Sequence, residues 1–118
     1  MKLAIIGSRT FNNFDLVEQT ITNNFVISSI TKIISGGAKG ADTLAEQWAA
    51  AHDKELQVFN AKWGEYGKSA GFKRNIEIVE AADQVLCFWD GVSAGTASSI
   101  ELCKKHNKPC TVIYITKE

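Results

Sequence analysis

Five short apolar segments alternate with longer amphipathic segments along the chain. Most of the apolar segments are rich in Val and Ile and are bounded by Gly, Asn or Asp, which is typical of buried β-strands. The segments between them are long enough to form helices. We therefore expect strands at residues 2–6, 31–35, 56–59, 84–89 and 110–115.

Two helices are expected in the first half of the chain. Asp15, followed three residues later by Glu18, has the spacing of a capping box at the start of the first helix. Asp42 is placed to cap the second helix. Trp48 shares the apolar face of that second helix with Leu44, so we assign Trp48 to the core.

Two further helices are expected in the second half. The third covers residues 71–82, where apolar side chains recur at helical spacing. The fourth begins at Thr96 and carries Lys104 and Lys105 in its last turn, where positive charge is favourable. Pro109 cannot continue a helix, so the fourth helix ends before it.

The resulting order of elements is βαβαβαβαβ, which predicts a parallel sheet covered by helices on both faces. Crossovers between parallel strands are right-handed, which leaves few topologies. The expected fold class is α/β: a single three-layer Rossmann-like domain with a five-stranded parallel sheet. A chain of 118 residues leaves room for one domain, which we expect to span residues 1–118.

Composition and charge narrow the choice of partners and location. Thirteen basic residues balance thirteen acidic ones, so no net field attracts nucleic acid, and we do not expect a nucleic acid partner. No apolar stretch approaches the roughly 20 residues of a membrane span, and the apolar run after Lys2 is too short for a signal peptide. We expect a cytoplasmic protein without a membrane contact.

The three cysteines and two histidines do not form a metal-binding pattern. Cys87, Cys103 and Cys110 contain no CxxC pair, and the histidines stand apart from each other. A zinc site needs clustered ligands, so we expect no metal and no cofactor. Cys87 and Cys110 lie in apolar runs, where a free thiol behaves as a small buried apolar group.

Three glycine-rich loops follow predicted strands, at residues 7–10, 35–42 and 90–99, and hold six of the nine glycines. In this fold, ligands bind beyond the carboxyl ends of the strands. Glycine lets backbone N–H groups approach a ligand, and a helix N-terminus adds free donors and partial positive charge. The loops predict an anion site, with phosphate as the usual occupant. The alternative is that the glycines only form tight turns.

Charged and hydroxyl side chains gather in and near these loops. Arg9 and Lys39 supply positive charge for phosphate groups, whereas Arg74, Asn75 and Asp90 are expected beside the ribose or base. Neither a Walker A motif nor a GxGxxG fingerprint is present. The predicted ligand-binding residues are Gly7, Ser8, Arg9, Gly36, Gly37, Lys39, Gly40, Asp42, Trp63, Arg74, Asn75, Asp90, Ser93, Gly95 and Thr96.

Residues 60–75 form an irregular segment that mixes aromatic and basic side chains. Trp63 and Tyr66 stand near Lys62 and Lys68, so the rings either stack on a base or pin the segment onto the sheet. Aromatic side chains are also enriched at interfaces. We expect a homo-oligomer in which this segment contacts a second subunit; the alternative is a monomer in which the rings pack under the segment.

Four motifs of the chain resemble the SLOG superfamily, which includes the DprA/Smf proteins and the Lonely Guy enzymes. They are Gly7-Ser8-Arg9, residues 35–42, Arg74-Asn75 and residues 93–96, and the likeness extends from Lys2 to Ile115. The chain is most similar to small stand-alone members of uncharacterised function. The resemblance implies a Rossmann-like fold and a nucleotide or nucleotide-derived ligand. Some members hydrolyse the N-glycosidic bond of a nucleotide, others sense ADP-ribose-type signals, and DprA binds single-stranded DNA.

The hydrolytic members carry the motif PGGxGTxxE, whose glutamate acts together with an upstream arginine. Arg74 corresponds to that arginine, but Ser99 stands at the position of the glutamate. Glu46 is a candidate substitute if the protein is an enzyme. We therefore expect a binding protein for an ADP-ribose-like or cyclic nucleotide signal, acting as sensor, carrier or sponge. A nucleoside 5′-monophosphate phosphoribohydrolase is the second hypothesis, and single-stranded DNA binding is the third.

Overall fold

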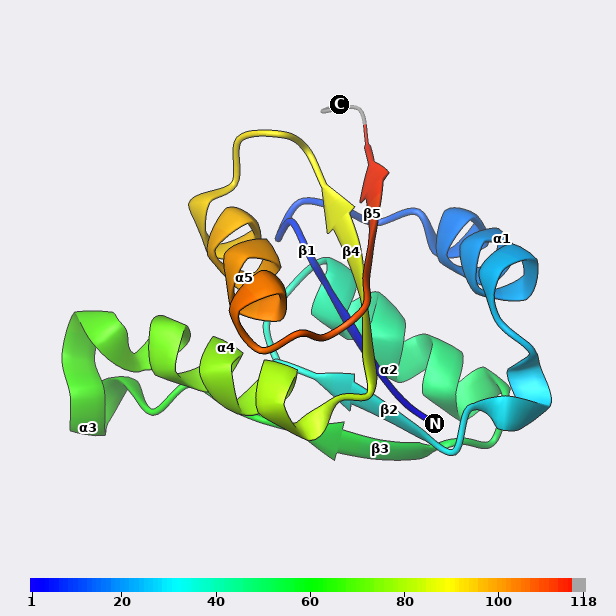
Figure 1. Cartoon of the computed structure of the whole chain (residues 1–118), viewed down its shortest axis with the longest axis horizontal. Helices are drawn as coiled ribbons and strands as arrows, with labels where there is room; N and C mark the ends of the chain where they lie inside the picture. Colours follow the sequence, from blue (N-terminus) through cyan, green and yellow to red (C-terminus); the bar gives the residue numbers. More distant parts are fainter. Residues whose placement is uncertain (116–118) are drawn as a thin grey trace.

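The computed structural model describes residues 1–115 and confirms the predicted α/β fold. Its five parallel strands lie in the order β3-β2-β1-β4-β5 (Figure 1). Each strand begins and ends within one residue of its predicted bounds. The strands are β1 (Lys2–Gly7), β2 (Lys32–Ser35), β3 (Glu55–Val58), β4 (Gln84–Trp89) and β5 (Cys110–Tyr114).

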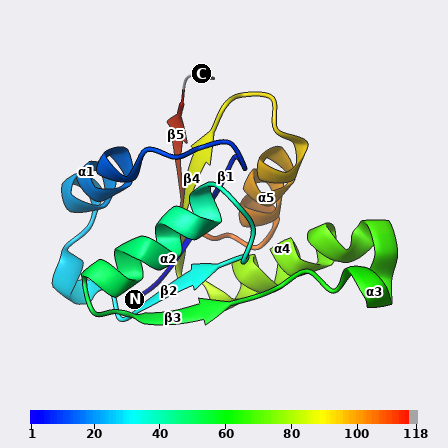
Figure 2. The same cartoon turned by 180° about the vertical axis from the view of Figure 1, so that it is seen from behind.

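Helices cover both faces of the sheet, as expected for three layers. Figures 1 and 2 show α1 and α2 on one face and α4 and α5 on the other. The α-helices are α1 (Phe14–Asn24), α2 (Ala41–Ala51), α3 (Trp63–Tyr66), α4 (Ala70–Ala81) and α5 (Ala94–Lys105), and the short 3-10 turns are η1 (Ile27–Ser29) and η2 (Gly67–Ser69).

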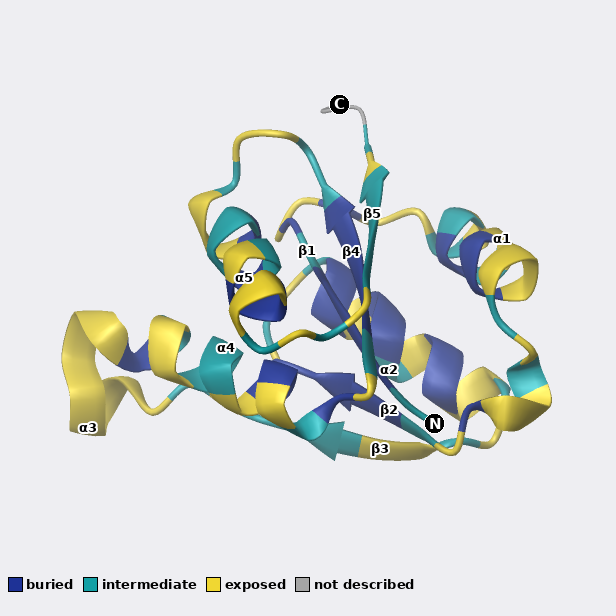
Figure 3. Cartoon of the chain, in the orientation of Figure 1, coloured by how far each residue is buried: buried dark blue, intermediate teal, exposed yellow. Residues whose placement is uncertain are grey.

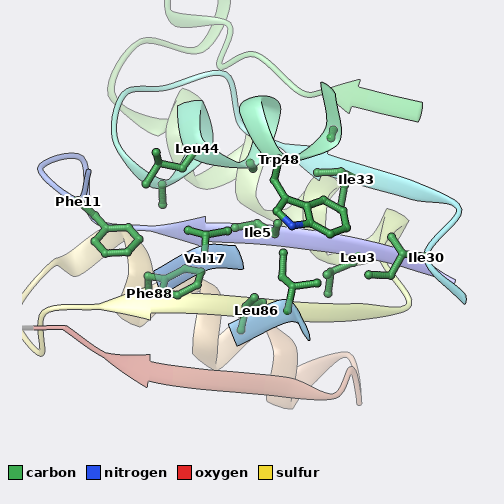
Figure 4. Close-up of a cluster of buried hydrophobic side chains, with 14 residues drawn as sticks. Leu3, Ile5, Phe11, Val17, Ile30, Ile33, Leu44, Trp48, Leu86 and Phe88 are labelled. Atoms are coloured by element: carbon green, nitrogen blue, oxygen red, sulfur yellow. The ribbon is translucent and has the colours of Figure 1, made fainter. Parts of the chain in front are cut away.

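The alternation of side chains along the central strands divides the core between the two faces. Leu3 and Ile5 of β1 pack with α1 and α2, whereas Ala4 and Ile6 pack with α4 and α5. Trp48 is fully buried in the first of these clusters, which confirms its assignment to the core (Figure 4). Figure 3 shows that burial is concentrated in β1, β2, β4 and the facing side of α2. The central strands are therefore fixed from both sides.

The helix starts differ from the predicted ones. Asn13, not Asp15, caps α1, because its Oδ1 accepts a hydrogen bond from the backbone N–H of Leu16 at 3.0 Å. Glu18 does not complete a capping box; its carboxylate lies 2.9 Å from Nε2 of His52, the residue that follows α2. Asn and Asp both suit a cap position, and in the structure α1 begins at Phe14, directly after Asn13.

Two other helix starts differ from the prediction by the same two residues, whereas α4 lies within one residue of its predicted bounds, and one short helix was not predicted. Gly40, not Asp42, is the cap residue of α2, and α5 begins two residues before Thr96. The segment at residues 60–75 is not merely irregular, because it forms α3 and η2. Such short turns have too few residues for a periodic signal.

Candidate ligand-binding site

A pocket of about 420 Å³ opens at the carboxyl ends of β1 and β4. The strand order reverses at this point, because β2 and β3 lie on one side of β1 whereas β4 and β5 lie on the other. In open parallel sheets such a switch point leaves a crevice between two diverging loops. The pocket is lined by residues 6–10, by Asp42, by Arg74, Asn75 and Ile78 of α4, and by Asp90, Val92, Ser93, Gly95, Thr96 and Ser99.

Gly40 holds two of the glycine-rich loops against each other. Its backbone has φ 75° and ψ −125°, a region that is essentially restricted to glycine. A Cβ at this position would overlap the backbone of Ser8 and Arg9, and the next residue, Ala41, donates its N–H to the Ser8 carbonyl at 3.3 Å. The close approach of the two loops therefore requires glycine at position 40.

Asp90 organises the loop between β4 and α5. Its Oδ1 accepts hydrogen bonds from the backbone N–H groups of Val92 at 2.9 Å and Ser93 at 2.8 Å, and its Oδ2 accepts from the Ser93 hydroxyl at 2.9 Å. These donors, first the two N–H groups, lower the pKa of Asp90 to about 2. Such a carboxylate is a weak base. Although Asp90 lines the pocket, its main role is to hold the loop in place through these hydrogen bonds.

The hydroxyl of Ser93 links this loop to the first one. Its Oγ lies 3.2 Å from Oγ of Ser8, and since Ser93 donates to Asp90, the Ser8 hydroxyl is the donor between them. Trp89 Nε1 donates to the Ser93 carbonyl at 3.1 Å. The two strands on either side of the switch point thus present a connected pair of hydroxyl groups to the pocket.

Arg74 approaches the pocket from α4 and is held by two hydrogen bonds. Its Nη1 donates to the Gly36 carbonyl at 2.6 Å and its Nε donates to Asn75 Oδ1 at 2.9 Å. Burial lowers the pKa of Arg74, and the nearby charge of Asp42 opposes this effect. A Cβ at Gly36 would lie 2.8 Å from Asp42 Oδ2 and 2.9 Å from Arg74 Nη1. Glycine at 36 therefore leaves room for both charged groups.

The N-terminus of α5 faces the pocket; Asp90 occupies the N–H of its cap residue Ser93, and the N–H groups of the first turn follow. The first N–H groups of a helix have no acceptor within the helix, and Gly95 and Thr96 of this turn line the cavity. A Cβ on Gly95 would meet no atom within 4 Å, so packing does not require glycine there. The open space above Gly95 lets a ligand approach the backbone closely.

Comparison with known proteins identifies the family. Residues 1–66 match the model of the YspA, cpYpsA-related SLOG family, called YAcAr. The chain is also 33% identical over 115 residues to the gene 61 protein of Mycobacterium phage D29, and the match covers 92% of each chain. The chain belongs to the YAcAr family. The resemblance to SLOG proteins drawn from four motifs is thereby confirmed.

A solved structure of the DNA processing protein A (DprA) from Helicobacter pylori, reported for its single-stranded DNA binding mode, shares the fold of this YAcAr chain. The TM-score is 0.67 at 22% identity, with 95% of this chain and 64% of the DprA chain covered. The chain therefore spans less than two thirds of that DprA chain, and the likeness establishes the fold alone. Membership of the YAcAr family supports a role that involves nucleotides or nucleic acids.

The pocket of this YAcAr protein brings together ten of the fifteen residues predicted to bind a ligand. The five others lie outside the lining: Gly36, Gly37, Lys39, Gly40 and Trp63. The three glycines lie in the loop between β2 and α2, where an added Cβ would meet neighbouring atoms at under 3 Å. Lys39 of the same loop is exposed. Trp63 is 53% exposed and lies beside Gly71 of α4.

Five lining residues were absent from the predicted set: Ile6, Thr10, Ile78, Val92 and Ser99. Thr10 directly follows a predicted motif, and Ile78 lies four residues after Arg74 on the same side of a helix, so both had a usable signal. Ser99 is buried and donates its hydroxyl to the Gly95 carbonyl at 3.1 Å. Glu46 does not line the pocket.

Within residues 1–115, no group of three or more His, Cys, Asp or Glu side chains is arranged to hold a metal ion. Over the same residues, the helices are too short or too polar to cross a membrane. The three cysteines are free thiols; Cys87 and Cys103 are buried, and Cys110 Sγ lies 3.5 Å from Cys87 Sγ. The cytoplasmic location and the single-domain span of residues 1–118 stay predictions.

Proposed function

We propose that the pocket binds a nucleotide or nucleotide-derived ligand, in the class of ADP-ribose-like or cyclic nucleotide signals. In this role the protein acts as a sensor, carrier or sponge for the signal. The observation that carries the proposal is the α5 N-terminus, whose Gly95 leaves the backbone open to a cavity of about 420 Å³. That volume lies within the range of sites for small ligands, roughly 300–1,000 Å³.

The phosphate group is best placed at the N-terminus of α5. The backbone N–H groups near Gly95 and Thr96 supply donors, and the partial positive charge of the helix end favours an anion. Arg9, which is exposed at the mouth of the pocket, adds a full charge. Lys39 is exposed and is not among the lining residues, so we assign the charged contact with phosphate to Arg9.

A thermal-shift panel of nucleoside mono- and diphosphates, ADP-ribose and cyclic nucleotides tests the proposal. A ligand present at 100 times its Kd is expected to stabilise the protein by about 2.7 kcal/mol. The informative variant is Gly95→Ala. Alanine is favoured over glycine in a helix by up to about 1 kcal/mol, so this variant is expected to melt at a slightly higher temperature. Its ligand-induced shift is expected to shrink, because the new methyl group occupies the space over the backbone.

The two effects of Gly95→Ala separate binding from folding. A loss of binding in a more stable protein cannot come from misfolding. Gln19→Ala is the control, since Gln19 is exposed on α1 and lies outside the pocket lining. A panel in which no nucleotide, ADP-ribose or cyclic ligand shifts the melting temperature would overturn the proposed function.

Hydrolysis of an N-glycosidic bond ranks below binding. Arg74 lines the pocket as a hydrolase would require, but Ser99 lies where the acidic residue is expected, and its hydroxyl is engaged with the helix backbone. Asp90, with a pKa of about 2, is poorly suited to proton transfer near neutral pH. These features favour a pocket that holds its ligand without cleaving it.

Single-stranded DNA binding is the other candidate, because the fold is shared with DprA and basic residues surround the exposed rings of Trp63 and Tyr66. Lys73 Nζ lies 4.9 Å from the centre of the Tyr66 ring. We expect only weak binding to a single strand, since the chain has no net charge. A titration at 50 and 200 mM salt measures this. Tight binding at low salt that falls steeply with added salt would favour a groove that contacts several phosphates.

We propose that α3 and the start of α4 form a contact between subunits. Trp63, Tyr66 and Phe72 are 53%, 39% and 51% exposed, and Figure 3 shows α3 as an exposed projection at the end of α4 away from the sheet. The rings therefore do not pack under the segment. Light scattering is expected to give a mass above 12.9 kDa for wild type and a lower mass for Trp63→Ala, with Tyr114→Ala unchanged. A monomeric mass at every concentration would contradict this proposal and leave ligand binding intact.

A further inference from the structure

Two carboxylates line the pocket, and their surroundings differ. Both oxygens of Asp90 are occupied by donors from its own loop, two backbone N–H groups and the Ser93 hydroxyl. Asp42, in the first turn of α2, has a hydrogen bond from the backbone N–H of Ala38 to its Oδ2 at 3.1 Å. A carboxylate has about four acceptor positions on two oxygens, so Asp42 retains acceptor capacity that Asp90 has used.

Asp42 is also the more deeply placed of the two. The residue is only 8% exposed, and it belongs to the lining of the pocket. Burial raises its pKa, while the Ala38 N–H, the positive charge of Arg74 and the Gly36 N–H act in the opposite direction and do not fully compensate. A buried carboxylate with incomplete compensation is costly unless a further donor satisfies it. A ligand in the pocket can supply that donor.

The neighbouring arginine does not fill the remaining positions on Asp42. Arg74 directs Nη1 to the Gly36 carbonyl and Nε to Asn75, and both Arg74 and Asp42 border the space that a Cβ on Gly36 would occupy. The glycine thus keeps the two charged groups beside each other without a side chain between them. Arg74 places positive charge beside Asp42, but its own hydrogen bonds go to Gly36 and Asn75 and leave the Asp42 carboxylate to other donors.

The positions of Asp42 and the proposed phosphate site are complementary. Asp42 enters from α2, which packs on one face of the sheet, whereas Gly95 and Thr96 enter from α5 on the opposite face (Figures 1 and 2). A ligand with its phosphate at the N-terminus of α5 therefore has its sugar directed toward α2. The groups of a sugar that donate hydrogen bonds to a carboxylate are its hydroxyls.

We propose that Asp42 accepts hydrogen bonds from the 2′- and 3′-hydroxyls of a ribose, so that the ligand is a ribonucleotide with both hydroxyls free. This inference rests on the proposed function and narrows it to nucleoside 5′-phosphates, 5′-diphosphates and ADP-ribose-like compounds. A phosphate on O2′ or O3′ would bring a negative charge against the Asp42 carboxylate, which is unfavourable. Deoxynucleotides, and with them DNA, and cyclic nucleotides are therefore disfavoured in this pocket.

The test is a set of matched titrations with wild-type protein. ADP, 2′-deoxy-ADP, 3′-deoxy-ADP and 3′,5′-cyclic AMP are compared by calorimetry, together with the corresponding guanine, cytosine and uracil or thymine ribo and deoxyribo diphosphates. Each deoxy or cyclic compound is expected to bind at least about tenfold more weakly than its ribonucleoside diphosphate, because a buried acceptor is left without its donor. This comparison needs no variant.

The Asp42→Asn variant tests whether Asp42 produces the preference for ribonucleotides. Asparagine keeps a carbonyl oxygen for the Ala38 N–H and nearly the same shape, but it replaces one acceptor oxygen with a donor group. The variant is expected to weaken ADP binding about tenfold and to bring the ratio of ribo to deoxy affinity close to one. Asp15→Asn makes the same chemical change on exposed α1 and is expected to leave the ratio unchanged.

Each possible negative result overturns a different part of the proposal. Equal affinity of the wild type for ribo and deoxy ligands, or tight binding of cyclic AMP, would overturn the role of Asp42 and leave nucleotide binding standing. A ribo preference that persists in Asp42→Asn would assign the preference to another residue and also overturn the inference. If no nucleotide binds at all, the proposed function fails, and this inference fails with it.

Discussion

Gly40→Ala is expected to destabilise the protein by about 3 kcal/mol or more. Two costs combine in this variant. The backbone at Gly40, with φ 75° and ψ −125°, is strained for any residue with a Cβ, and the added methyl group overlaps the backbone of Ser8 and Arg9. Neither obstacle is the end of a flexible side chain, so the two loops must separate. The melting temperature is expected to fall on the order of 10 °C.

Thermal and urea denaturation of wild type, Gly40→Ala and Gly64→Ala measure this effect. The alanine at position 64 meets open space, so this control is expected to melt at the wild-type temperature or slightly above it. A Gly40→Ala protein as stable as wild type would show that the loops between β1 and α1 and between β2 and α2 do not need their close approach.

Arg74→Ala is expected to abolish most nucleotide binding and to lower stability by about 2 kcal/mol. The loss of stability comes from the Gly36 carbonyl, which loses a charge-assisted hydrogen bond of 2.6 Å, and from Asp42, which loses the positive charge beside it. The affinity for a nucleotide is expected to fall at least about tenfold, because a cation of the lining is removed. Calorimetric titration and urea denaturation of the same samples measure the two effects.

Lys73→Ala is the matched control, since it removes an equal charge from an exposed position on the same helix. Its binding is expected to match that of wild type. Release of free base from nucleoside monophosphates is measured in parallel, and wild type is expected to release none. Base release by wild type that disappears in Arg74→Ala would instead favour the hydrolase, and unchanged binding by Arg74→Ala would remove Arg74 from the ligand site.

The sequence predicted the sheet and the edge of the sheet where the pocket opens. Runs of Val and Ile between glycines are local signals for buried strands, and the order of strands and helices leaves few right-handed topologies. The motifs at residues 7–9 and 93–96 then had to meet, because both follow strands that end at the same edge. The strand order alone is therefore enough to bring these two motifs together at the switch point between β1 and β4, whatever the packing of their side chains.

The helix caps and the short helix α3 did not follow from local pattern. Asn13 and Asp15 both suit a cap, and the contact of Glu18 with His52, 34 positions later, belongs to the packing of α1 on α2. Four residues of α3 give no periodicity. Trp63 therefore had two open interpretations in the sequence, and its exposed position on a projecting helix was decided by the tertiary structure.

The sequence by itself determined which residue types gather at the site: glycines, hydroxyls, Arg74 and two aspartates at one edge of a parallel sheet. Only the tertiary structure decided how each is used. The direction of a side chain in a loop depends on backbone angles and on contacts with distant segments, as when Gly40 packs on Ser8 and Lys39 is left on the outside. In the same way, the contacts of Asp90 with its own loop and the burial of Asp42 in the first turn of α2 gave two similar carboxylates different capacities to bind a ligand.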